Sequence, residues 1–338
     1  MRGVDEEDPI LGAAGLVFRT PVRAKKHPRG NPSGSAGLKL AKAMGTIGRV
    51  VRRRPEVMVK VTGSARGFRG LKEHLAYITR NGKIAGEREG GELIEGSREV
   101  SRLAEEWWVD CGNDRPTRAR DTINLILSMP PGTDPEAVAE AARAFAQKTF
   151  GGEYDYLIAH HNHDSDPKRP ENPHAHLTVK TRGRDGQRLN PHKEDLQAWR
   201  EEFAQQLRLR NVKAEATPRR ARGVVRKGQR QAIRHMNDRR ASRVSRWKIE
   251  QALKTVTRGQ SPEATPWTNA TRERQRKVRR AWGQLAIALE DAGKTALAME
   301  VKQFVANLPT VATEREALVA VAQKALAKAL AKEPQRHR

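Results

Sequence analysis

The chain has 338 residues, of which 65 are lysine or arginine and 40 are aspartate or glutamate, so its formal net charge is +25. An excess of this size indicates a polyanionic partner, and nucleic acid is the leading candidate. A membrane-spanning protein is disfavoured because no run is apolar enough to span a bilayer. The chain contains one cysteine, which excludes an internal disulfide. Acidic residues precede the apolar stretch 10–18, unlike a secretory signal, so we expect a soluble cytoplasmic protein.

The first part of the chain is predicted to contain an arm and then a folded domain. Residues 1–55 are rich in Gly, Pro, Ser and basic residues without sustained periodicity, which predicts a flexible basic arm. Residues 56–215 instead show strand and helix patterns. Their predicted order is strand 57–62, helix 71–79, helix 97–110, strand 122–129, helix 133–150, strand 154–161, strand 172–179 and a helix from 191. This order predicts an α+β fold with an antiparallel central sheet flanked by helices.

The composition changes after Pro218. Residues 219–246 contain eleven arginines and lysines against one acid, so we interpret residues 216–272 as a basic connector. Residues 273–338 are more evenly charged and include alanine-rich stretches, which predict a helical C-terminal module.

Five of the ten histidines lie between residues 160 and 176. His174 and His176 are two positions apart in a predicted strand, so their imidazoles should share a face of the sheet. The preceding strand, joined to it by a polar loop, could supply His161 as a third ligand, and His163 has the same parity. Three histidines with an open coordination position suit a divalent ion that acts as a Lewis acid. Ligand softness alone favours Zn²⁺.

Tyr77 is one of only three tyrosines, the others being Tyr154 and Tyr156. A lone helical tyrosine is more often a packing residue. The basic surroundings of Tyr77 favour a functional role, because cations can contact phosphates and stabilise a phenolate. The basic residues near it in the sequence are Lys60, Arg66, Arg69, Lys72, Arg80 and Lys83.

Three motifs within residues 56–215 resemble those of the conjugative relaxases, which are mobilisation nucleases of the HUH endonuclease superfamily. The resemblance is strongest to the branch related to the T-DNA border endonuclease. Residues 75–79 resemble the first motif, which carries the nucleophilic tyrosine, and residues 127–130 resemble the second, whose serine, here Ser128, approaches the DNA. Residues 161–179 resemble the third motif, whose histidines hold the metal. This segment departs from the family pattern, because His163 replaces an acid and the following spacer is longer.

The resemblance implies that Tyr77 attacks one phosphodiester to give a 5′-phosphotyrosyl link and a free 3′-hydroxyl, a step that can be reversed. It also implies Mg²⁺ or Mn²⁺ at His161, His174 and His176. A nearby base must take the tyrosine proton. The candidates are Asp121, Asp164 and Asp166, and Asp164 is included in the predicted catalytic set. The predicted DNA contacts are Arg66, Arg69, Lys72, Arg80, Lys83 and Ser128.

The expected function is strand-specific nicking and rejoining of DNA at a transfer origin, for conjugative mobilisation. The expected partner is single-stranded and duplex DNA at that origin. The resemblance implies relaxosome accessory proteins and a type IV secretion coupling protein as further partners. It also implies a bacterial cytoplasmic location, or transfer together with the DNA. Two alternatives are a non-cleaving accessory protein that binds the origin and a replication-initiator nuclease of the same superfamily.

Overall fold

The structure, a computed structural model, describes residues 8–18, 36–112, 119–161, 172–224, 231–239, 242–262 and 266–330. The chain divides into two compact units. One, the sheet unit, comprises Arg53–Ala216. The other, the helical unit, comprises Met1–Arg52 and Thr217–Arg338, and its regular elements among the described residues are all helices.

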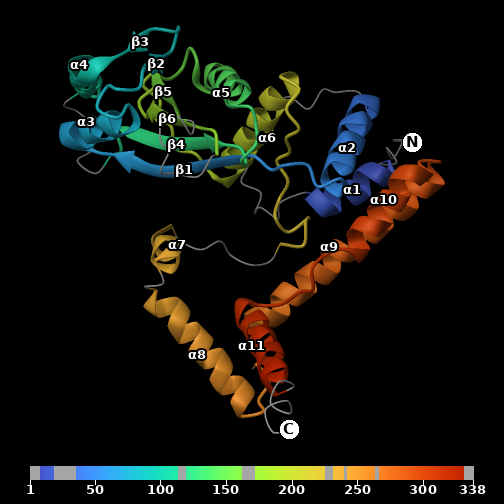
Figure 1. Ribbon diagram of the computed structural model, residues 1–338. Helices are drawn as coiled ribbons and strands as arrows, with labels where there is room; N and C mark the ends of the chain where they lie inside the picture. Colours follow the sequence, from blue (N-terminus) through green and yellow to red (C-terminus); the bar gives the residue numbers. More distant parts are fainter. Residues whose placement is uncertain are drawn as a thin grey trace. The chain divides into compact units, whose positions relative to one another are not determined.

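A six-stranded antiparallel sheet in the order β1-β4-β6-β5-β2-β3 forms the centre of the sheet unit (Figure 1). The strands are β1 (Met58–Ala65), β2 (Gly86–Arg88), β3 (Leu93–Ile94), β4 (Thr122–Ser128), β5 (Tyr156–His161) and β6 (His174–Lys180). The predicted antiparallel sheet is therefore confirmed. The sequence did not indicate β2 and β3, because strands of three and two residues are too short to show alternation.

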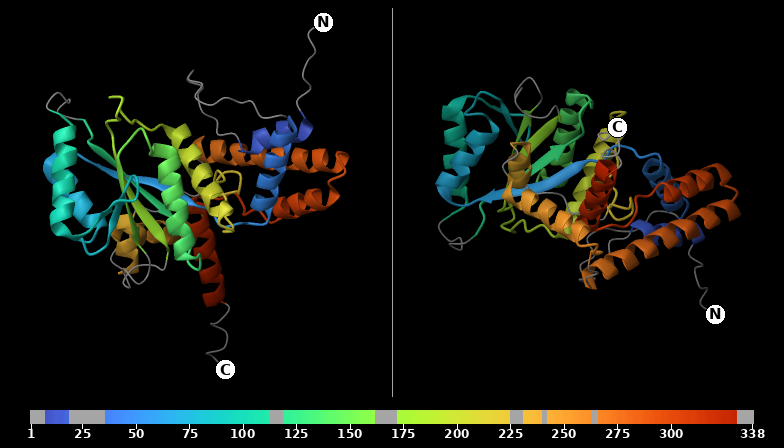
Figure 2. Two further views of the ribbon diagram at one scale, coloured as in Figure 1. Left: turned by 90° about the horizontal axis from the view of Figure 1, so that it is seen from above. Right: turned by 60° about the horizontal axis from the view of Figure 1, so that its bottom comes forward.

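Two helices cover each face of the sheet (Figure 2). On one face α5 (Pro135–Phe150) and α6 (Lys193–Leu209) enclose an apolar core with the alternate residues of β4 and β6. Its members include Leu125, Leu127, Phe145, Phe150, Leu177 and Phe203. On the other face α3 (Gly67–Ile78) and α4 (Gly96–Asp110) pack on β5, and that core includes Leu71, Leu75, Leu103, Trp107, Leu157 and Ala159. Helices flanking an antiparallel sheet are the predicted fold class.

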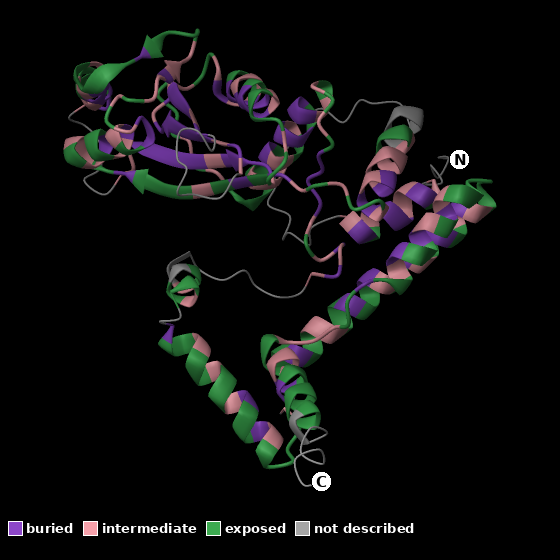
Figure 3. Cartoon of the chain, in the orientation of Figure 1, coloured by how far each residue is buried: buried purple, intermediate pink, exposed green. Residues whose placement is uncertain are grey.

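The face below α3 and α4 is apolar only in part. The residues of β4 and β6 that point to it include Asn124, Ser128, His176 and Thr178, all of them buried. Next to β4 lies the edge strand β1, whose residues are mostly exposed (Figure 3). The sheet therefore has a polar area near an accessible edge.

Two predicted helix starts are wrong by a few residues. The cap of α5 is Asp134, whose side chain accepts a hydrogen bond of 3.0 Å from the Glu136 amide, whereas Thr133 donates to the Pro130 carbonyl. Helix α6 begins after His192, whose amide donates to Asp195 at 2.7 Å, whereas the sequence predicted a helix from residue 191. Several polar residues stand before each helix, and sequence cannot tell which one meets an amide.

The N-terminal segment differs from the predicted flexible arm, because it contains α1 (Pro9–Phe18) and α2 (Ala36–Val51). Within the helical unit, both helices bury apolar residues in one core with α9 (Pro266–Asp291) and α10 (Thr295–Ala306). Phe18, for example, meets Trp282 edge to face, with 5.5 Å between the ring centroids. The high content of glycine and basic residues obscured this packing in the sequence.

The segment predicted as a basic connector also contains helices. These are α7 (Gln231–Asp238), α8 (Arg243–Thr257) and the beginning of α9. Arginine and lysine are good helix formers, so a high positive charge does not prevent a helix. Helix α11 (Glu314–Leu330) follows and packs with α8, where Lys248 pairs with Glu314 at 2.6 Å. No described helix combines the length and the low polarity that crossing a membrane requires.

The turn after α3 depends on a close contact between two backbone segments. Arg80, Asn81 and Gly82 have φ angles of 53°, 58° and 79°, in the left-handed region. A Cβ atom on Gly82 would lie 2.2 Å from the carbonyl carbon of Gly96. We expect Gly82→Ala to lower the free energy of unfolding by about 2 kcal/mol or more, measured by urea denaturation.

Gly90→Ala is the matched control for this effect. Gly90 also has a positive φ, 89°, but no described atom lies within 4 Å of the place that a Cβ atom would occupy. The control should therefore show the backbone strain without the clash, and a smaller loss of stability. Equal losses for both variants would show that the contact with Gly96 is unimportant.

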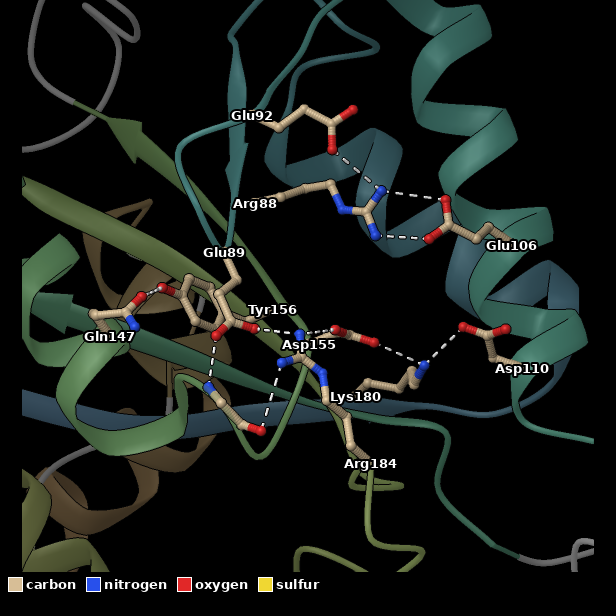
Figure 4. A network of polar contacts seen from close by, with 11 residues as sticks. Arg88, Glu89, Glu92, Glu106, Asp110, Gln147, Asp155, Tyr156, Lys180 and Arg184 are labelled. Carbon is tan, nitrogen blue, oxygen red and sulfur yellow. Dashed lines mark hydrogen bonds and ion pairs between the residues drawn. The ribbon is translucent and has the colours of Figure 1, made fainter.

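A network of charged side chains lies at one end of the sheet (Figure 4). It surrounds Lys180, the last residue of β6, whereas His174 is the first residue of that strand. Lys180, whose side chain is only 9% exposed, donates to Asp110 and Asp155, each at 2.9 Å. Arg184 pairs with Asp155 at 3.0 Å and with Glu89 at 2.7 Å. Because Asp110 ends α4 and Asp155 precedes β5, the network joins a helix to the sheet.

Removing Lys180 should destabilise the fold and change how the free energy of unfolding depends on pH. Desolvation raises the pKa of Asp155, but the hydrogen bonds and charges of Lys180 and then Arg184 outweigh it, so the pKa lies below its ordinary value. A carboxyl whose pKa is lowered on folding adds stability above its unfolded pKa of about 4, and loses it as the pH falls through the folded pKa. We expect Lys180→Met to cost about 3 kcal/mol at pH 7.

The same substitution should make stability fall less between pH 7 and pH 3, because Asp155 then keeps only Arg184. The midpoints of urea denaturation at pH 7 and at pH 3 measure this loss of stability. An unchanged difference between the two pH values would contradict the role given to Lys180. Lys148→Met is the control, because Lys148 pairs with Glu202 on the exposed surface of the same unit, with its side chain 54% exposed.

Candidate active site

The strand register brings three histidines together on one face of the sheet. His161 of β5 lies directly opposite His174 of β6, and His176 lies opposite Ala159. The ring centroids are 4.8 to 5.2 Å apart, and one ligand nitrogen from each ring lies within 4.8 Å of the others. The predicted alternation of the hairpin therefore holds.

Backbone carbonyls fix the protonated nitrogen in two of the rings. The Nε2 atom of His161 lies 2.7 Å from the carbonyl oxygen of Ile78, and Nδ1 of His174 lies 2.8 Å from that of Asn172. A carbonyl can only accept, so these nitrogens carry the hydrogen. Nδ1 of His161 and Nε2 of His174 then carry the lone pairs that can coordinate a cation. Histidines that bind metals commonly donate their other N–H to a carbonyl in this way.

The cluster fits a divalent ion. Ligand distances of about 2.1 Å separate the nitrogens around a metal by about 3.5 Å, so small side-chain rotations would bring these three into range. His161 and His176 are buried at 3% and 7% exposure, whereas His174 is half-buried, which leaves one side accessible. Imidazole suits several divalent ions, so the donor set does not select one.

Tyr77 lies next to this cluster at the end of α3. Its ring meets that of His176 edge to face with 5.9 Å between the centroids, and it is 47% exposed. The carbonyl bonded to His161 belongs to the next residue, Ile78. The fold therefore holds an accessible phenol beside three imidazoles that lie far from it in the sequence.

His74, which the sequence interpretation overlooked, lies one turn before Tyr77 in α3. The two ring centroids are 6.2 Å apart, and the rings are inclined by 30°. Burial lowers the pKa of His74 to about 4, so this imidazole is neutral at pH 7. The spacing of three residues in a helix was the available signal. His160 points to the other sheet face and is not in the cluster.

The basic residues near Tyr77 in the sequence do not all lie near it in space. Arg80 lies two residues after the end of α3, in the turn that also leads to Lys83. Arg69 pairs with Glu73 at 2.7 Å on the exposed side of the helix, and the Nζ atom of Lys72 lies 5.8 Å from the centre of the Phe68 ring. Arg66 precedes the first turn, so the helix places it about 16 Å along its axis from Tyr77.

The register also locates the predicted serine and one candidate base. Ser128 is the pairing partner of His174, but it is 3% exposed, and its hydroxyl lies 3.3 Å from the Met129 carbonyl. Asp121 precedes the other end of β4 and accepts a hydrogen bond from the Gly67 amide at 2.6 Å. It lies about 20 Å along the strand from the histidines, which removes it as a base for Tyr77. His163, Asp164 and Asp166 lie outside the described residues.

Comparisons with known proteins address the same region. Residues 77–211 match the family model for the nuclease domain of MobA/VirD2-like relaxases, a range that includes Tyr77 and the three histidines. The T-DNA border endonuclease VirD2 of Rhizobium radiobacter is 29% identical over 144 residues, which are 38% of this chain and 32% of VirD2. The chain thus matches about a third of the length of this relative.

Solved structures give more distant similarities. The conjugative relaxase TrwC, in a metal-bound complex with oriT DNA, is 12% identical with a TM-score of 0.33, over 80% of this chain and 98% of TrwC. A protein from work on vancomycin resistance transfer in Staphylococcus aureus is 17% identical with a TM-score of 0.31, over 49% of this chain and 99% of that one. The family model and the VirD2 match confirm the resemblance seen in the motifs: residues 77–211 are similar to the nuclease domain of MobA/VirD2-like relaxases.

Proposed function

We propose that this chain is a metal-dependent tyrosine relaxase that nicks one DNA strand at a transfer origin and rejoins it. The observation that supports this most directly is the edge contact between Tyr77 and His176, one of three clustered histidines. A nucleophile and a set of metal ligands in contact can act on the same phosphate. The match of this segment to relaxase nuclease domains agrees with the proposal.

In the proposed reaction the Tyr77 hydroxyl oxygen attacks the scissile phosphorus. The bond to the 3′ oxygen breaks, so the 5′ end becomes linked to the tyrosine, and the departing oxygen takes a proton as a 3′-hydroxyl. The reverse attack by that hydroxyl restores the strand and frees the tyrosine. A divalent ion held by His161, His174 and His176 would supply positive charge that offsets the charge developing on the phosphate.

The tyrosine proton needs an acceptor, and we propose Asp164 for this role. Because His74 is neutral at pH 7 and lies beside Tyr77, it is a second group that can position the phenol or take its proton. Arg69, Lys72, Arg80 and Lys83 would contact DNA phosphates around α3. Ser128, which pairs with His174 on the adjacent strand, would approach the DNA next to the histidines.

We further propose that residues 56–215 act as the nuclease domain on single-stranded DNA. The basic segment 216–272 and residues 1–55 would hold the flanking duplex, and residues 273–338 would form a helical module that meets other proteins. Relaxosome accessory proteins and a type IV secretion coupling protein are the proposed partners. The proposed place of action is the bacterial cytoplasm, or the recipient after transfer with the DNA.

The test is incubation of the purified chain with supercoiled plasmid carrying a candidate transfer origin and Mn²⁺ or Mg²⁺, followed by SDS and protease. Relaxed plasmid with peptide on a 5′ end, formed only with metal, is the expected result. Origin binding without cleavage, unchanged by a chelator, would contradict the proposal and indicate an accessory protein. Cleavage at a replication origin alone would indicate an initiator nuclease.

A further inference from the structure

A second basic site lies at the end of the sheet opposite the histidines. It is a cavity of about 340 Å³ whose lining includes three arginines, Arg66, Arg120 and Arg188, together with Thr181 and Asn190. We call it the arginine pocket. Arg66 and Arg120 are 54 residues apart in the sequence, and Arg120 and Arg188 are 68 apart, so no local sequence motif indicates the pocket.

The ends of three neighbouring strands build this pocket. The Asp121 amide donates to the Ala65 carbonyl at 3.0 Å, which places Arg66 beside Arg120. The Thr181 amide donates to the Asp121 carbonyl at 2.8 Å, just beyond the end of β6. An isolated β-bridge pairs Arg182 with Arg188, which places Arg188 at this same end of the sheet. The arginines therefore converge because of the sheet register.

The polar contacts in the pocket hold two guanidinium groups in position. Arg120 donates to the side-chain oxygen of Asn190 at 2.9 Å. Arg188 donates to the Thr181 hydroxyl at 3.2 Å and to the Arg120 carbonyl at 2.5 Å. All of these acceptors are neutral, so the positive charges are oriented but not neutralised.

The carboxylates at this end of the sheet have other partners. Asp121 accepts from the Gly67 amide, and Asp110 and Asp155 accept from Lys180. Among the residues that the structure describes, none forms an ion pair with Arg66, Arg120 or Arg188. Converging arginines without a carboxylate suit a phosphate, which accepts paired hydrogen bonds from guanidinium groups.

We infer that the arginine pocket binds a backbone phosphate of the DNA at a distance from the scissile bond; this rests on the proposed function. Six residue steps of β4, from Thr122 to Ser128, separate the two ends of the sheet by about 20 Å. Helix α3 runs between them, with Arg66 before its first turn and Tyr77 in its last. At about 3.4 Å per base pair along a strand, this separation corresponds to about six base pairs.

The test compares two labelled oligonucleotides that carry the nick site, one extending only about three nucleotides from it and one about fifteen. The variant is Arg120→Gln with Arg188→Gln in the full chain. We expect about tenfold weaker binding of the long oligonucleotide near 0.1 M salt and a salt dependence reduced by one to two phosphate contacts, with the short one unaffected. The amount of covalent adduct at saturating DNA should not change.

Arg98→Gln with Arg102→Gln is the matched control, because both arginines are exposed on α4 and the same charge is removed. Unchanged binding of the long oligonucleotide, or equal losses in variant and control, would overturn the inference. Arg66→Gln, at an exposed position, gives a second variant that breaks none of the bonds holding Arg120 and Arg188. It should weaken binding of the long oligonucleotide alone.

The two proposals fail in different ways in this experiment. If the wild type forms no adduct but prefers the long oligonucleotide, and the variant loses that preference, the nuclease proposal is wrong and the pocket still binds DNA. If the wild type forms the adduct and the variant binds both oligonucleotides normally, the pocket inference is wrong. Thermal unfolding of each variant shows that the fold is retained.

Discussion

Tyr77→Phe is expected to lower covalent adduct formation and nicking by at least about 10³-fold, because the attacking oxygen is removed. The remaining ring can keep its edge contact with His176, and the side chain is 47% exposed, so stability should hardly change. The measurement uses an oligonucleotide labelled at its 3′ end, whose label moves with the protein on a denaturing gel when the 5′ phosphate becomes attached.

Tyr154→Phe and Tyr156→Phe complete this experiment, because the chain has no other tyrosines. The Tyr156 hydroxyl contacts Gln147 of α5 at 3.1 Å, on the face of the sheet away from the histidines. Both controls should form the adduct at close to the wild-type level. A labelled adduct with Tyr77→Phe would show that another residue is the nucleophile.

His174→Ala is expected to weaken metal binding at least tenfold and to reduce nicking by about 10²-fold or more. One of three ligands is lost, and since His174 is half-buried, its removal should leave the fold intact. Titration of the purified chain with Mn²⁺, followed calorimetrically, measures the affinity. Excess Mn²⁺ should restore part of the nicking by the variant, and a chelator should abolish nicking by the wild type.

His160→Gln separates metal binding from a general effect of losing a histidine. His160 is the neighbour of His161 in β5 but points to the opposite face, where burial first, and then Arg143 and His161, lower its pKa to about 4. Its substitution should leave the metal affinity unchanged. Equal losses in both variants, or full nicking by the wild type in a chelator, would contradict a metal role for the cluster.

The parts that the sequence predicted well depend on local periodicity. Alternation along β5 and β6 was enough to place His161, His174 and His176 on one face, because cross-strand neighbours must share a side of the sheet. The long helices of the sheet unit follow their apolar spacing in the same way. Strands β2 and β3 were too short to show such a signal, and helix α1 is apolar on all sides. Helix α2 has the helical spacing of apolar residues, at Leu40, Ala43, Ile47 and Val50, but its glycines and basic residues obscured it.

The charged residues of the site were harder to predict, because sequence proximity is a poor guide along a helix. Arg66 and Arg80 are both close to Tyr77 in the sequence, yet one lies at the far end of α3 and the other at the near end. The partners of Arg66 in the arginine pocket come from two other strands. His74 was detectable from its helical spacing, but its burial and its lowered pKa depend on the packed structure.

The hydrogen bonds from His161 to Ile78 and from His174 to Asn172 make these two imidazoles chemically unequal. His161 can then coordinate a metal through Nδ1, the ring nitrogen nearer the main chain. His174 can coordinate it through Nε2, the nitrogen at the tip of the ring. An amide oxygen can imitate either position, but with different side-chain lengths. Asparagine reaches about as far as the inner nitrogen and glutamine about as far as the outer one. Position 161 should therefore tolerate Asn better than Gln as a ligand, and position 174 should show the opposite order.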